Sequence, residues 1–189
     1  MSKIEDAVVD FITNKGTFFA SLLSQMKRTS DPVNTETMKV SIENGRVNLF
    51  YNPDFIDGRT MKDTKAILEH ECLHIVMEHH ARFKKKDHQV AKIATDLAIN
   101  QLITNIPKDA ITIQSIFGQS AYSVLHNESA EYYYDKIMQD PKLKKEFQSS
   151  KCMIGTCGND FKDGDGSTMN EDLQKEIIKQ MVKEAVDHA

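Results

Sequence analysis

Residues 66–77, AILEHECLHIVM, combine an apolar helical pattern with two histidines four positions apart. Residues four apart on an α-helix differ by about 40° around its axis, so His70 and His74 project from one face. Two imidazoles on one face can occupy two corners of a zinc tetrahedron. Ionisable side chains in a largely buried helix cost free energy unless they have a compensating role. The stretch therefore predicts a helix that binds Zn²⁺ through His70 and His74; the alternative is a surface helix with its polar residues in solvent.

Glu71 directly follows the first histidine. On a helix it lies about 60° from His74, on the same side, where its carboxylate can accept a proton from a water without binding the metal. Zinc lowers the pKa of such a water toward about 7. This arrangement predicts a zinc-dependent hydrolase, and more specifically a peptidase, with Glu71 as the general base.

A catalytic zinc site needs a third protein ligand that leaves one position open. His79 and His80 are close in sequence, but on a continuous helix they point about 160° and about 100° away from the His70–His74 face. His80 has the spacing of the third histidine in metzincins, although Met77 stands where that pattern has the glycine that turns the chain back. His80 therefore remains an alternative third ligand.

Asp96 is the preferred third ligand. It lies in residues 91–103, a mostly apolar segment, where an aspartate needs a cation or several hydrogen-bond donors. It follows His74 by 22 residues, a spacing similar to that of the glutamate ligand in gluzincins. Asn100 stands one helical turn later and is expected to orient Asp96 or the substrate. A capping or pairing role at the edge of the core is the alternative for Asp96.

The segments around this motif predict an α+β fold. Two alternating segments over residues 39–51, joined by Asn44-Gly45, are typical of a β-hairpin. A helix start at Thr60 to Asp63 precedes the histidines, and the helical pattern continues into the low eighties. The other expected elements are helices over 4–27 (split near 14–16), 88–104, 129–139, 141–149 and 169–188, with loops over 28–37 and 151–168.

Composition narrows the class of protein. The 189 residues include 24 basic and 28 acidic ones, and the formal charge of −4 argues against a nucleic-acid partner. No stretch reaches the roughly 18 apolar residues of a membrane span, and the acidic N-terminus does not suit a signal peptide. Three cysteines fit a reducing compartment. We expect a cytoplasmic protein, with one domain over 1–150 and a loop with a C-terminal amphipathic helix over 151–189.

The stretch 68–102 carries His70-Glu71-x-x-His74, then His79 and Arg82, then Ala94-Thr95-Asp96-Leu97-Ala98-Ile99-Asn100. It resembles a metallopeptidase family of bacteria and phages, in which the peptidase-like region often precedes a von Willebrand factor A-like domain. The resemblance covers about residues 17–140. It implies a zincin-like α+β core and zinc hydrolase chemistry.

A second hypothesis is a catalytically silent, zinc-stabilised module that binds a protein partner, for example through the amphipathic final helix. Glu71 discriminates between the two hypotheses, because a structural zinc needs no base and prefers a closed shell of four ligands. The run Tyr132-Tyr133-Tyr134 offers phenols that could stabilise an oxyanion, although packing is the commoner role of such aromatic residues.

Overall fold

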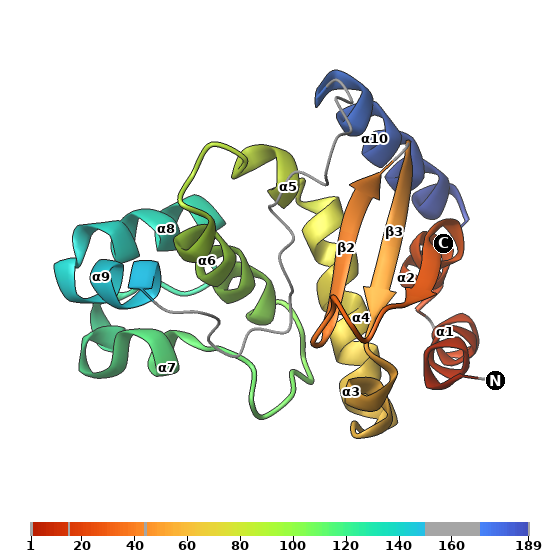
Figure 1. Ribbon diagram of the computed structural model, residues 1–189, viewed down its shortest axis with the longest axis horizontal. Helices are drawn as coiled ribbons and strands as arrows, with labels where there is room; N and C mark the ends of the chain where they lie inside the picture. Colours follow the sequence, from red (N-terminus) through yellow and green to blue (C-terminus); the bar gives the residue numbers. More distant parts are fainter. Residues whose placement is uncertain (1, 15, 44, 150–170, 189) are drawn as a thin grey trace.

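The computed structural model describes residues 2–14, 16–43, 45–149 and 171–188 (Figure 1). Helices and a three-stranded sheet make a mixed α+β fold, as the sequence predicts. The predicted loop over 151–168 and the predicted start of the final helix lie outside the described residues. In chain order the elements are α1 (Lys3–Thr13), α2 (Thr17–Gln25), β1 (Lys27–Ser30), β2 (Met38–Glu43), β3 (Arg46–Tyr51), α3 (Pro53–Asp57), α4 (Met61–Val76), α5 (His79–Arg82), α6 (His88–Asn100), α7 (Ile113–Phe117), the 3₁₀ helix η1 (Gly118–Ser123), α8 (Ala130–Gln139), α9 (Pro141–Ser149) and α10 (Glu171–Asp187).

The hairpin of β2 and β3 lies where the alternating pattern predicts it, with Met38 opposite Tyr51. Gly45, before β3, has a φ of +75°, a conformation that glycine adopts without steric penalty. The sequence places residues 28–37 in a loop, but β1 pairs in parallel with β3, so the strand order is β1-β3-β2. That prediction was wrong because four polar residues carry no strand periodicity, and their partner strand lies beyond the hairpin turn.

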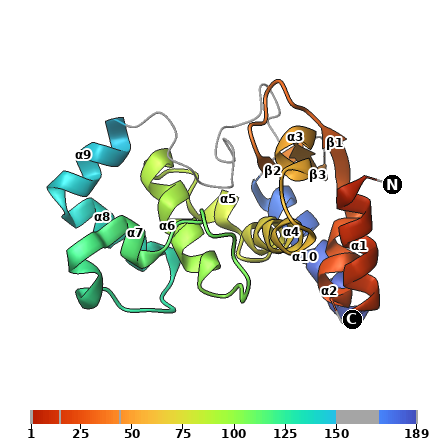
Figure 2. The ribbon, with the colours of Figure 1, turned by 90° about the horizontal axis from the view of Figure 1, so that it is seen from below.

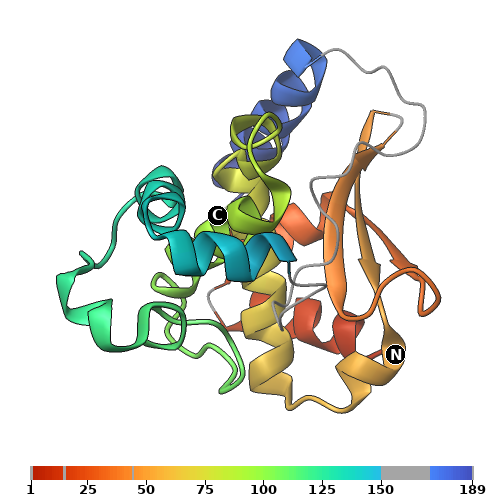
Figure 3. The same cartoon turned by 60° about the vertical axis from the view of Figure 1, so that its left-hand side comes forward.

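Two hydrophobic cores lie side by side (Figures 1 and 2). The N-terminal core contains buried residues from the helices α1, α2, α3, α4 and α10 and from the sheet. The helical core joins the segment from α6 to α9. Figure 3 shows the sheet on one side of α4 and the helices of the helical core on the other. A small apolar group lies between the cores. Its buried residues are Ala66, Ile99 and Ile103, and the partly buried Leu73, Met77 and Ile106 pack against them.

The final helix packs on the rest of the chain. Ile178, Met181 and Ala185 of α10 are buried in the N-terminal core, and α10 contacts α2 and α4. Part of its apolar stripe is therefore covered within this molecule, whereas Leu173 is 50% exposed. Within the described ranges, no helix combines the length and the apolar character that crossing a membrane requires.

The helix that carries the two histidines begins where the sequence predicts. The Thr60 hydroxyl accepts a hydrogen bond from the Asp63 N–H at 3.1 Å, and the Asp63 carboxylate accepts one from the Thr60 N–H at 3.3 Å. This reciprocal capping box satisfies two backbone donors that a helix start otherwise leaves unpaired. The start of α4 is thus fixed by local sequence.

The end of α4 differs from the prediction. The sequence predicts a helix into the low eighties, but α4 ends at Val76 and α5 begins at His79. Between them Glu78 adopts a left-handed conformation with a φ of 53°. The Met77 carbonyl, left without a helical partner, accepts a hydrogen bond from Arg82 Nη1 at 2.8 Å. The prediction was wrong because no glycine or proline marks this break.

Candidate metal centre

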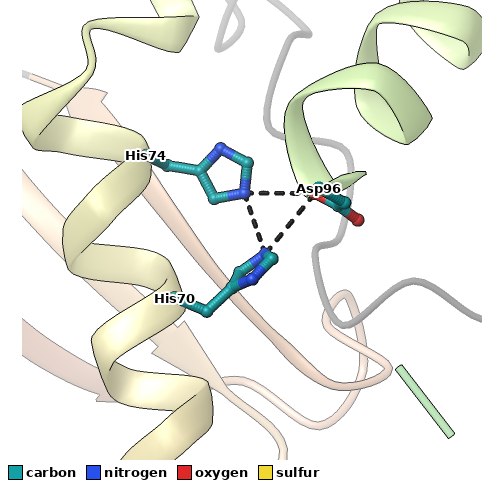
Figure 4. A group of neighbouring side chains, drawn as sticks. All are labelled: His70, His74 and Asp96. Carbon is teal, nitrogen blue, oxygen red and sulfur yellow. Dashed lines mark hydrogen bonds and ion pairs between the residues drawn. The ribbon is translucent and has the colours of Figure 1, made fainter. Parts of the chain in front are cut away.

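Three side chains from two helices meet at the boundary between the two cores (Figure 4). His70 and His74 project from α4, and Asp96 projects from α6. His74 Nε2 lies 3.0 Å from His70 Nε2, and Asp96 Oδ1 lies 3.4 Å from His70 Nε2 and 3.2 Å from His74 Nε2. The three residues are buried, with exposed fractions of 2%, 1% and 1%.

The spacing of these atoms fits one face of a tetrahedral metal site. Zinc–ligand distances of about 2.0–2.1 Å imply about 3.3 Å between neighbouring corners of the tetrahedron. The edges of the observed triangle are 3.0, 3.2 and 3.4 Å. Three protein donors of this kind leave a fourth position for water or substrate. The cluster is therefore able to hold a metal ion.

The electrostatics of the cluster favour the metal-binding protonation states. Burial raises the pKa of the Asp96 carboxyl, but its contacts with His70 and His74 outweigh burial and hold that pKa well below its usual value. Burial lowers the pKa of His74, and this outweighs the opposing effect of Asp96. At pH 7 the cluster thus presents a carboxylate and a neutral imidazole, the forms in which these groups bind metals.

Asn100 contacts His70 rather than Asp96, the partner that its place in the sequence suggests. The Asn100 amide nitrogen donates to the Ile111 carbonyl at 3.0 Å, which turns Oδ1 toward His70 Nδ1 at 2.9 Å. Because an amide oxygen only accepts, His70 Nδ1 carries the proton and Nε2 keeps its lone pair. Asn100 therefore sets the tautomer of His70 that a metal requires.

His79 lies against His74, with 3.1 Å between their Nδ1 atoms. It is fully buried, and burial, reinforced by His74 and Arg82, lowers the pKa of His79 to about 2. Sequence reasoning points this side chain away from the histidine pair, and that expectation was wrong because α4 ends at Val76. A left-handed residue in this break is seldom anything but glycine or asparagine, so the local sequence contains no signal for it.

His80, the alternative third ligand, lies elsewhere. Its Nε2 donates to the Val40 carbonyl of β2 at 3.3 Å. It is not part of the group formed by the two α4 histidines and Asp96. The structure thus brings Asp96, and not His80, to His70 and His74.

A family model described as "Putative metallopeptidase domain" matches residues 2–189. The chain belongs to this family. An uncharacterized protein of Thermotoga maritima is 42% identical over 77 residues, which cover 39% of this chain and 19% of that protein. The match thus spans about a fifth of the relative's length. No solved structure matches the chain. The family and the cluster both point to a metal ion.

Glu71 of this metallopeptidase-family chain is fully buried in α4, directly after His70. On the helix it lies about 60° from His74 around the axis. A carboxylate in such a place costs free energy unless it has a partner or a function. Its neighbour Cys72 is a buried thiol whose pKa is raised by burial and then by the charge of Glu71.

The three consecutive tyrosines of this family member hold loops. Tyr133 donates its hydroxyl to the Leu125 carbonyl at 3.0 Å, and the Tyr132 hydroxyl accepts from the Leu125 N–H at 3.0 Å. The Tyr134 hydroxyl accepts from the Asp87 N–H at 3.1 Å. Each hydroxyl thus has a structural role, and Tyr133 and Tyr134 are also buried in the helical core.

Proposed function

We propose that this chain is a zinc-dependent hydrolase, and more specifically a peptidase that acts on proteins or peptides. The observation that carries the proposal is the buried triangle of His70 Nε2, His74 Nε2 and Asp96 Oδ1, with edges of 3.0–3.4 Å. Two histidines and one carboxylate form a ligand set known from zinc peptidases. The family description supports the choice of a peptidase. A zincin-like arrangement of α4 and α6 is part of this proposal.

Each residue of the proposed site has a separate role. His70, His74 and Asp96 would hold the zinc ion. When bound, zinc supplies a Lewis acid that polarises a carbonyl and lowers the pKa of water toward about 7. Glu71 accepts the proton of the attacking water and delivers it to the leaving amine. Asn100 keeps His70 in the tautomer with an unprotonated Nε2.

Glu71→Gln tests the hydrolase directly, because it keeps the shape of the side chain and removes the proton acceptor. We expect zinc content and fold to stay unchanged and activity to fall by about 10²-fold or more. Since the substrate is unknown, new protein N-termini are counted in cells that produce either form. Glu69→Gln is the matched control, because Glu69 is a half-buried carboxylate on the same helix outside the proposed site.

The proposal predicts a set of new N-termini that appears with the parent chain and with Glu69→Gln, and is missing with Glu71→Gln. Identical termini in all three samples, with zinc retained in each, would exclude catalysis as the function.

The second candidate is a catalytically silent zinc module that binds a protein partner. The burial of the site favours it, because Glu71 is 0% exposed and no ligand residue exceeds 2%. A structural ion needs no general base, however, and it normally has four protein ligands. If Glu71→Gln leaves both zinc content and every cellular effect unchanged, this candidate replaces the peptidase.

A further inference from the structure

The break between α4 and α5 turns His79 back toward a proposed metal ligand. On a continuous helix His79 would point about 140° away from His74. Instead Glu78 adopts a φ of 53° and a ψ of 33°, a left-handed conformation that is uncommon for residues other than glycine. Arg82 Nη1 holds the turn by donating to the Met77 carbonyl at 2.8 Å. Sparsely populated backbone conformations of this kind persist where surrounding contacts stabilise them, and they cluster at functional sites.

The contact that results joins two imidazole rings. The Nδ1 atoms of His79 and His74 are 3.1 Å apart, and the rings are inclined by 72°. The other ring nitrogen of His79 has no hydrogen-bond partner among the described residues. Within that part of the chain, the only hydrogen bond of the buried His79 side chain is therefore the one with His74.

Which of the two histidines donates this hydrogen bond follows from which nitrogen of His74 faces the metal site. His74 points Nε2 at His70 and Asp96, so an ion bound there requires the His74 proton on Nδ1. His74 Nδ1–H then donates, and His79 Nδ1 accepts. The relation parallels that of Asn100, whose Oδ1 accepts the Nδ1–H of His70 at 2.9 Å.

We infer that His79 is a positioning residue of the metal centre: it accepts the Nδ1–H of His74 and so holds the His74 ring with its Nε2 lone pair directed at the ion. His79 is not itself a ligand. The inference rests on the proposed zinc site. Loss of such an outer partner of a metal-bound histidine usually lowers metal affinity by about 10–100-fold.

Two substitutions of His79 distinguish its hydrogen bond to His74 from a role in packing alone. In His79→Asn, the amide oxygen takes nearly the place of the histidine Nδ1 and can accept the same hydrogen bond. In His79→Leu, the side chain fills a similar volume without an acceptor. His80→Leu is the matched control, because His80 contacts the Val40 carbonyl instead of the cluster. Melting curves of the metal-free forms verify that each variant folds.

Zinc affinity is measured by competition with a chromophoric chelator, and the His74 tautomer by two-bond ¹H–¹⁵N correlation of the zinc-loaded protein. We expect His79→Leu to bind zinc about 10–100-fold more weakly and to lose the protected Nδ1–H signal of His74. His79→Asn should retain both, and His80→Leu should match the parent.

Three results would overturn the inference, and they differ from one another. If the parent chain binds no zinc, the proposed function falls and the role of His79 falls with it. If the parent binds zinc and His79→Leu is unchanged in affinity and tautomer, only the inference fails. If both His79 variants lose zinc as completely as His74→Ala, His79 is a ligand and not a positioning residue.

Discussion

The N-terminal core and the helical core are built differently. The N-terminal core gathers segments far apart in the chain, from Ile4 in α1 to Ala185 in α10, around a sheet. The helical core is one continuous stretch, from Phe83 to Phe147, in which helices alternate with loops and no strand occurs. Each has its own buried apolar cluster, and the apolar group between them is small. The cluster of His70, His74 and Asp96 takes two side chains from α4 of the first core and one from α6 of the second, so it exists only when both cores are folded and docked.

A metal ion at the boundary would act on stability as well as on chemistry. An ion held by α4 and α6 ties together two cores that otherwise share few apolar contacts. Metal binding then contributes to the folding free energy, because the complete ligand set does not exist in the unfolded chain. Changes at the boundary should therefore affect zinc affinity, whereas similar changes within one core should not.

The largest expected effect comes from removing the one ligand that the helical core supplies. Asp96→Ala should lower zinc affinity by more than about 100-fold. Loss of a residue that only hydrogen-bonds to a metal ligand costs up to about 100-fold, and loss of a ligand should cost more. The substitution should also abolish stabilisation by zinc, which for a single site at a 100-fold excess over Kd amounts to about 2.7 kcal/mol, or about 5–11 °C in Tm.

Chelator competition and thermal melting with and without zinc measure both effects. His80→Ala serves as the control. If His80→Ala loses the metal and Asp96→Ala does not, the third ligand is His80 and not Asp96.

An intermediate effect is expected from pH in the metal-free protein. Burial, reinforced by His74 and Arg82, lowers the pKa of His79 to about 2, whereas an unfolded histidine titrates near about 6.5. Below about pH 6.5 the unfolded chain binds the additional proton, so the free energy of unfolding falls as pH falls, by up to about 1.4 kcal/mol per pH unit for this group. His74, whose pKa is also lowered by burial, acts in the same direction.

Urea unfolding at pH 7, 6 and 5 measures this slope. His79→Leu should flatten it, because the variant lacks one of the buried neutral histidines. An equal slope in the parent and in His79→Leu would show that His79 does not stay neutral in the folded protein.

The smallest expected effect comes from a single ion pair across the boundary. Arg59, before α4, contacts Asp109, after α6, through two hydrogen bonds of 2.8 and 2.6 Å. Both side chains are partly exposed, so Arg59→Ala should lower the free energy of unfolding by only about 0.2–1 kcal/mol. A double-mutant cycle with Asp109→Ala isolates the pair.

The Arg28–Glu5 pair is a suitable comparison, because it has similar exposure but lies within the N-terminal core. Zinc affinity should fall slightly in Arg59→Ala and stay constant in Arg28→Ala. Equal zinc affinity in the two variants would mean that the docking of the two cores does not limit how tightly the site binds zinc.

Local patterns in the sequence account for much of the fold and of the site. The capping box at Thr60, the hairpin around residue 45 and the helical spacing of His70 and His74 each depend on a few neighbouring residues. An aspartate in an apolar helix requires a partner, and this predicts that Asp96 lies near the pair. These features need no knowledge of distant contacts.

What the sequence does not predict depends on contacts between distant segments or on a backbone state without a residue signature. β1 is held by its parallel pairing with β3, and its four polar residues have no strand pattern. The end of α4 depends on a left-handed Glu78, where glycine would be the usual signal. The position of His79 follows from that break, so it could not be derived from helical phase.

The zinc content of protein purified without chelators tests the proposed metal centre directly. We predict one zinc per chain, removed by a chelator and restored by titration at a one-to-one ratio. X-ray absorption of the restored protein should show two imidazole nitrogens and oxygen ligands at about 2.0–2.2 Å. Protein that contains no zinc after mild purification, and takes up none on titration, would contradict a metal centre formed by His70, His74 and Asp96.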